Sequence, residues 1–86
     1  MIRLHGSGTY STLLGSDLTR DGMFLELHRG PMGGSSVVAE AFYSDATRSM
    51  TTSIFQRDIP NEILEEFFAE ARTCLPPIAS AAEGTD

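Results

Sequence analysis

The sequence predicts an α+β domain in which an antiparallel meander of about four strands is followed by one C-terminal helix. Residues 58–77 have the apolar periodicity of a helix. The segments before them are short, alternate in polarity and are separated by turn residues. Because a helix with a broad apolar stripe has to cover one face of a sheet, we expect the order ββββα.

Three segments have the composition of central strands: residues 23–28, 37–43 and 49–55. In the first of them, successive side chains alternate between the two faces of the strand. One face carries Met23, Leu25 and Leu27, and the other carries Phe24, Glu26 and His28. Neither face of the second segment is polar: Val37, Ala39, Ala41 and Tyr43 lie on one face, and Val38 and Phe42 flank Glu40 on the other.

Antiparallel sheets with one solvated face usually alternate more cleanly than this. We therefore expect the face away from the helix to be partly covered by a second copy of the chain, which makes the protein a homodimer. The alternative is that aromatic rings and long side chains shade a solvated face. The register of the hairpin between residues 37–43 and 49–55 stays open, and so does the face of it that meets the helix.

A further strand is expected before these three. Asp21-Gly22 predicts a two-residue hairpin turn, which places Leu18 beside Leu25 on the Met23 face. This strand extends back towards Thr9, with a bulge or bend at residues 15–16. Residues 1–5 are compatible with one more short strand.

The helix has recognisable start and stop signals. Asp58 is expected to cap its N-terminus and Pro60 suits the first turn, whereas Pro76 and Pro77 prevent continuation beyond Leu75. The apolar stripe comprises Ile63, Leu64, Phe67, Phe68, Ala71, Cys74 and Leu75. The domain is thus expected to span residues 1–77, followed by a flexible acidic tail over residues 78–86.

The chain of 86 residues carries 12 acidic side chains and six basic ones, and its formal net charge is −6. This sign disfavours nucleic acid and anionic membranes as partners and suits a basic protein, although acidity also serves solubility alone. A single cysteine excludes an internal disulfide and a thiolate zinc site, and no stretch of 18 apolar residues occurs. We expect a cytoplasmic protein without membrane association.

No catalytic constellation emerges, so no enzyme, cofactor or metal is predicted. Glu26 and His28 are two residues apart on one strand, and Glu40 could add a third ligand, yet such neighbours are ordinary polar surface pairs. Cys74 is expected to be a small core residue. The glycine-rich segment 30–36 precedes a strand and contains no lysine, so it predicts a flexible loop and not an anion site.

The acidic face of the helix is the predicted partner-binding surface. It consists of Glu62, Glu65, Glu66 and Glu70. Like charges at i, i+4 spacing repel one another, and a cationic partner would relieve that repulsion, although a solvated face also tolerates it.

These patterns favour a small, non-catalytic, acidic protein-interaction or regulatory module that binds a basic partner protein. One alternative is single-stranded nucleic-acid binding through the sheet face, with Phe24, Phe42 or Phe55 as stacking platforms. A second alternative is a small-ligand or metal site at a dimer interface. The candidate residues on the sheet face are Phe24, Glu26, His28, Glu40 and Phe42.

Overall fold

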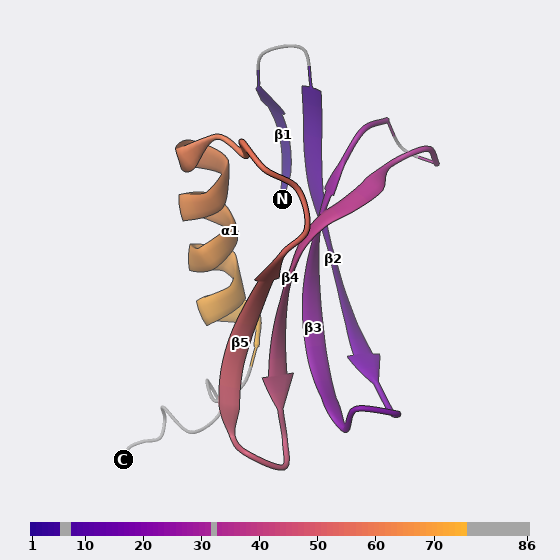
Figure 1. Ribbon diagram of the computed structural model, residues 1–86, viewed down its shortest axis with the longest axis vertical. Coiled ribbons are helices and arrows are strands. Elements are labelled where there is room, and N and C mark those ends of the chain that lie inside the picture. Colours follow the sequence, from indigo (N-terminus) through magenta and orange to yellow (C-terminus); the bar gives the residue numbers. More distant parts are fainter. Residues whose placement is uncertain (6–7, 32, 76–86) are drawn as a thin grey trace.

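The computed structural model describes residues 1–5, 8–31 and 33–75, and all structural statements below concern these residues. The elements are β1 (Ile2–His5), β2 (Gly8–Asp17), β3 (Gly22–Arg29), β4 (Ser36–Ser44), β5 (Ser49–Ile54) and α1 (Asn61–Cys74). The five strands form one antiparallel sheet in sequential order, and α1 packs against it (Figure 1). The predicted meander with a C-terminal helix is confirmed, with five strands because residues 2–5 pair with β2.

The hairpins β2–β3 and β4–β5 have the same four-residue design. Each loop ends in a residue with left-handed backbone conformation, Asp21 at φ 55° and Arg48 at φ 56°. In the first loop, Asp17 Oδ1 accepts hydrogen bonds from the backbone N–H groups of Thr19 and Arg20, at 3.0 and 3.1 Å. The Asp17 side chain therefore closes this turn, with Asp21 in the strained position.

The predicted two-residue turn is wrong. The loop comprises the four residues 18–21, so the register of β2 against β3 differs from the expected one. Leu14, and not Leu18, lies opposite Leu25. Leu18 is at the tip of the loop, where 94% of its surface is exposed. The pairing of β2 with β3 continues through Gly15 without the predicted bend.

A register shift in β4 corrects a second prediction. Leu27 pairs with Ala39 and His28 pairs with Val37, so Val38 has no partner on β3. An extra residue of this kind reverses the alternation of the strand on one side of it. As a result Val38 is buried together with Ala39 and Val37 is exposed, whereas simple alternation groups Val37 with Ala39 and Val38 with Glu40.

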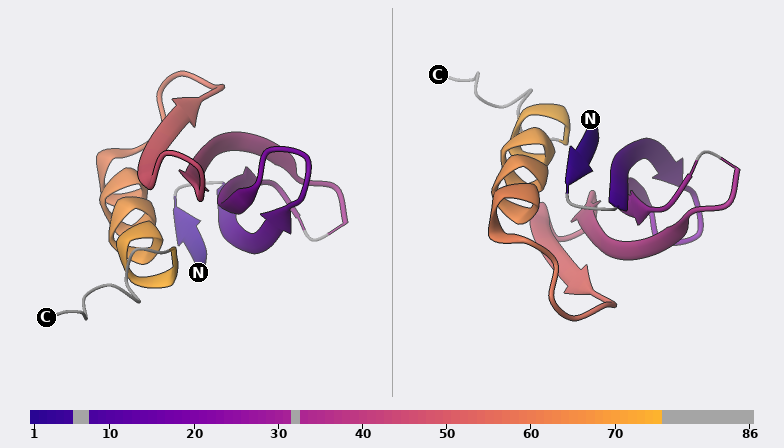
Figure 2. Two further views of the ribbon diagram at one scale, coloured as in Figure 1. Left: turned by 90° about the horizontal axis from the view of Figure 1, so that it is seen from below. Right: turned by 90° about the horizontal axis from the view of Figure 1, so that it is seen from above.

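The hydrophobic core lies between α1 and one face of the sheet, which we call the covered face; the opposite one is the open face. The helix contributes Ile63, Phe67, Ala71 and Leu75, and the sheet contributes Tyr10, Leu25, Leu27, Val38, Ala39, Ala41 and Tyr43. The sheet is strongly twisted and curls around α1, so that β1 runs alongside the helix (Figure 2). In the part of the chain that the structure describes, no helix is long and apolar enough to cross a membrane.

The helix boundaries confirm the predicted stop but not the predicted cap. Pro60 occupies the N-cap position and no side chain caps the helix. Asp58 has a left-handed conformation at φ 62°, two residues before the N-cap, so its carboxylate does not cap α1. The helix ends at Cys74, and Leu75 is extended, as expected for a residue followed by proline. The predicted tail over residues 78–86 lies outside the described residues.

Candidate functional site

The five sheet-face residues that the sequence singles out all lie on the open face. Phe24 is opposite Phe42 and Glu26 is opposite Glu40 on β3 and β4, and His28 is two residues from Glu26 along β3. Directly opposed residues of an antiparallel pair point to the same side of the sheet. Alternation along β3 was sufficient to predict this grouping.

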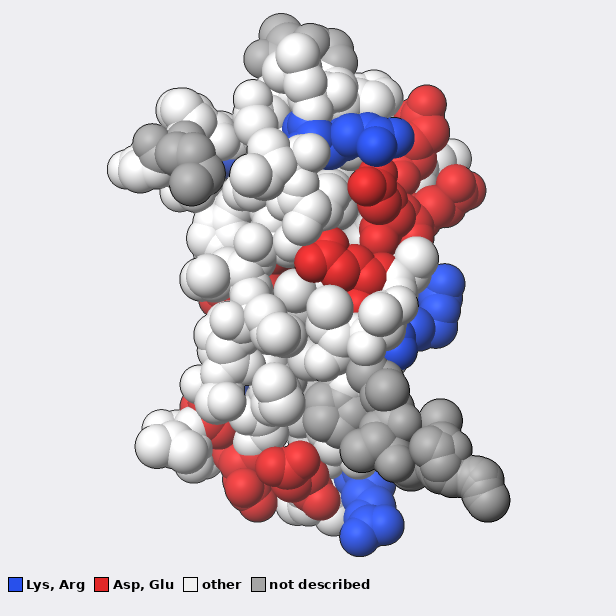
Figure 3. Space-filling view, turned by 180° about the vertical axis from the view of Figure 1, so that it is seen from behind, with Lys and Arg blue, Asp and Glu red and all other residues white. Residues whose placement is uncertain are grey.

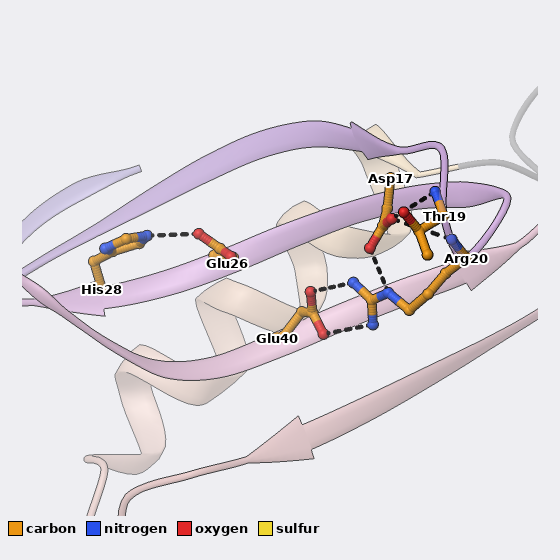
Figure 4. A network of polar contacts seen from close by, with 6 residues as sticks. All are labelled: Asp17, Thr19, Arg20, Glu26, His28 and Glu40. Carbon is orange, nitrogen blue, oxygen red and sulfur yellow. Dashed lines mark hydrogen bonds and ion pairs between the residues drawn. The ribbon is translucent and has the colours of Figure 1, made fainter.

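Glu26 and Glu40 form a like-charged cross-strand pair, which destabilises a sheet unless other groups compensate it. Each carboxylate has a different partner (Figure 4). His28 Nε2 lies 2.9 Å from Glu26 Oε1, and His28 Nδ1 lies 3.0 Å from Ser35 Oγ. Glu40 is bound by Arg20. The two acids are thus turned towards separate hydrogen-bond networks.

The side chain of Arg20 extends from the β2–β3 turn over the open face and binds two carboxylates there. Its terminal nitrogens donate to both oxygens of Glu40, at 3.1 and 2.7 Å, and its Nε donates to Asp17. The guanidinium carbon lies 4.1 Å from the centroid of the Phe42 ring. Arg20 lowers the pKa of the Asp17 carboxyl through their hydrogen bond, and the bonds to Glu40 and Asp17 raise the pKa of Arg20. Sequence reasoning missed this cluster because it depends on the turn register.

Aromatic rings cover glycines on the same face. A Cβ atom at Gly15 would lie 2.5 Å from the Phe24 ring, and one at Gly22 would lie 2.6 Å from the Phe42 ring. The outer atoms of both rings therefore lie against glycine backbone, and both side chains are half-buried without any second molecule. This supports the view that aromatic side chains shade this part of a solvated face.

The other end of the open face, on β1 and β2, is uncovered and aliphatic. Ile2, Leu4 and Leu13 expose 74%, 72% and 53% of their surfaces. They share the open face because Leu13 is opposite Glu26, and Ile2 and Leu4 are opposite Ser11 and Thr9, which alternate with the core residue Tyr10. We call these three residues the aliphatic patch. Exposed aliphatic side chains that adjoin one another on a rigid sheet are typical of contact surfaces.

The acidic row of α1, which consists of Glu62, Glu66 and Glu70, contacts basic groups as well as solvent, because β1 runs antiparallel beside it. Glu66 Oε1 lies 3.3 Å from Arg3 Nη1, and Glu62 Oε1 lies 3.2 Å from His5 Nε2. Glu70 Oε1 lies 3.3 Å from the α-amino nitrogen of Met1. In Figure 3 the acidic side chains gather in a red patch with a blue arginine lying against it.

Geometry explains this match. Every second residue of a strand advances by about 6.6 Å and every fourth residue of a helix by about 6 Å, so the two rows stay in step. The alternation of Met1, Arg3 and His5 against acids at i, i+4 spacing was a signal that the sequence contained. The cationic partners that were predicted to come from another molecule are supplied by residues 1–5 for Glu62, Glu66 and Glu70. The fourth acid, Glu65, is exposed.

The described residues offer little for metal binding. They contain no group of three or more His, Cys, Asp or Glu side chains placed to hold a metal ion. Glu40, considered as a third ligand beside Glu26 and His28, is bound by Arg20 instead. Cys74 is half-buried at the end of α1.

The geometry also does not favour a nucleic-acid surface. Arg20 is the one basic residue among those described that reaches over the open face, and it is bound to two carboxylates above the Phe42 ring. Arg3 on β1 and Arg29 on β3 both pair with Tyr10 of β2, so they belong to the covered face. A stacking platform needs free rings with cations that track a phosphate backbone.

Comparison of the chain with protein-family models, with curated proteins and with solved structures gives no match.

Proposed function

We propose that this chain is a small non-catalytic protein-interaction module whose open face binds a partner protein with an apolar and basic contact surface. The observation that carries the proposal is the aliphatic patch, which presents Ile2, Leu4 and Leu13 on an ordered strand pair. Burying such side chains provides binding free energy in proportion to the apolar area removed from water.

The charges beside the aliphatic patch indicate the sign of the partner. Among the described residues, the carboxylates of Asp17, Glu26 and Glu40 belong to the open face, whereas Arg20 is the one guanidinium placed over it by these contacts. The face is therefore net negative, and a basic surface would meet a complementary potential. These charges support a binding site for the basic partner on the sheet, and not on the acidic row of α1.

The proposal is tested by affinity capture from an extract of the native host. The tagged chain is compared with Ile2→Ser/Leu4→Ser, a double variant that removes the two most exposed members of the patch. Leu18→Ser is the matched control, since Leu18 is a fully solvated leucine at the β2–β3 loop. The partner should be retained by Leu18→Ser and lost with Ile2→Ser/Leu4→Ser, while circular dichroism shows that both variants are folded.

The charge component is tested separately with the purified partner. Raising the salt concentration from about 0.1 to 0.5 M shortens the Debye length and should slow association more than dissociation. Glu65→Lys changes the acidic helix face away from the sheet and should leave the affinity unchanged. A partner that binds Ile2→Ser/Leu4→Ser as tightly as the parent chain would refute the open face as its binding surface.

A further inference from the structure

Among the residues that the structure describes, the outer edge of β5 is a free hydrogen-bonding edge. β5 is the last strand of the sheet, and the described residues pair with it on one side only, through β4 (Figure 1). The backbone N–H of Phe55 donates to Val38 O on the β4 side, at 2.8 Å. Since the direction of these groups alternates along a strand, Met50, Thr52 and Ile54 direct their N–H and C=O groups to the outer side.

This edge lacks the features that normally prevent strand addition. Such features include charged side chains, proline and very short strands. Residues 49–56 contain no charged residue and no proline, in a chain with a net charge of −6. Thr52 and Ile54 are exposed, so α1 does not cover this part of the edge. The opposite edge strand, β1, has four residues, carries Arg3 and His5, and runs alongside α1.

The sequence of β5 is complementary to itself about a two-fold axis at Thr52. When two copies pair antiparallel with Thr52 opposite the partner's Thr52, Met50 meets the partner's Ile54 on the covered face. The three outward-facing residues of each copy then form about six backbone hydrogen bonds. Ile54, which exposes 50% of its surface, gains the partner's Met50 as an apolar neighbour. Arg48 falls opposite the partner's Gln56, so no like charges are opposed.

We propose that two copies of this chain associate through β5, forming one continuous ten-stranded sheet with its two-fold axis at Thr52. We expect a second copy at this edge because an uncharged edge lets two acidic chains approach. In the self-paired register no like charges are opposed. The surface is separate from the aliphatic patch, so this inference does not rest on the proposed function. A short edge interface belongs to the weak, concentration-dependent class of associations.

Sedimentation equilibrium tests the proposal over about 10 μM to 1 mM. The apparent mass should rise from 9.3 kDa towards twice that value. Thr52→Lys places two like charges on the axis and should raise the dissociation constant by on the order of tenfold or more. Thr52→Glu should do the same, and an equimolar mixture of the two variants should restore the dimer. This restoration would not follow from a loss of folding.

Leu4→Lys is the control that separates the two surfaces, because Leu4 lies on the open face at the opposite edge of the sheet. It should leave the dimer intact. The proposal is overturned if the parent chain stays at 9.3 kDa up to about 1 mM, which leaves the edge to a strand of another protein. It is equally overturned if Leu4→Lys abolishes the dimer while Thr52→Lys preserves it, since association would then use the open face.

Discussion

Replacement of Phe67 by alanine tests the packing of α1 on the sheet. Phe67 is fully buried at the centre of the core, and its ring centroid lies 5.8 Å from that of Phe68. Removing a buried phenylalanine side chain costs about 3–5 kcal/mol, which combines lost transfer free energy with a residual cavity. A domain of 86 residues has about 4–13 kcal/mol of unfolding free energy in total. We therefore expect Phe67→Ala to lose between about a quarter and all of its unfolding free energy.

The measurement is urea unfolding followed by circular dichroism, which suits a chain without tryptophan. With a slope of about 1 kcal/mol per molar urea, the midpoint should fall by roughly 3–5 M. Phe68→Ala is the matched control, since Phe68 is half-buried at the edge of the same stripe and should lose less than half as much. Phe67→Leu fills part of the cavity and keeps the transition measurable. Equal losses for Phe67→Ala and Phe68→Ala would refute the packing of α1 as described.

Two further predictions concern the polar contacts. A double-mutant cycle with Arg3→Ala and Glu66→Ala should give a coupling free energy below about 1 kcal/mol, because both side chains are solvated, and 1 M salt should abolish it; a coupling that persists in salt would contradict a solvated pair. The pKa of Asp17 is lowered by Arg20 in the folded chain, so its contribution to stability is complete above the usual aspartate range near pH 4 and is lost as the pH falls through the lowered value. Asp17→Asn should flatten the stability profile below about pH 4, and an unchanged profile would argue against the hydrogen bond.

Sequence patterns predicted the fold well where one physical cause dominates. The periodicity of α1 and the prolines that follow it fix the helix and its end, and alternation along β3 fixes its two faces. Prediction failed where two choices are nearly equal in local energy. Val37 and Val38 are identical side chains, and the shift in the pairing of β3 with β4 decides that Val38 is the buried one. The loop at Asp17 competes with the turn favoured by Asp21-Gly22, and the pairing of β2 decides between them.

The candidate site was predictable in its members but not in its contacts. Glu26, His28 and Glu40 could be placed on one face because a strand alternates with a period of two. That Arg20 binds Glu40 depends on the length of the β2–β3 loop, which local sequence did not determine. The partners of the acidic row come from β1, about 60 residues earlier in the chain, and only the tertiary fold brings them together.

The two proposed surfaces have a joint consequence. In the β5 pairing, opposed residues belong to the same face, so both open faces lie on the same side of the continuous sheet. The two aliphatic patches then lie near its opposite ends, about 34–43 Å apart along the sheet, because seven strand spacings separate the two copies of β2 and nine separate the two copies of β1. A partner with two such contact sites would be bound bivalently, and the second contact would form at a high effective concentration. Thr52→Lys should then keep the affinity for a single contact site and lose the gain from bivalency. Retention of that gain in a monomeric variant would separate partner binding from self-association.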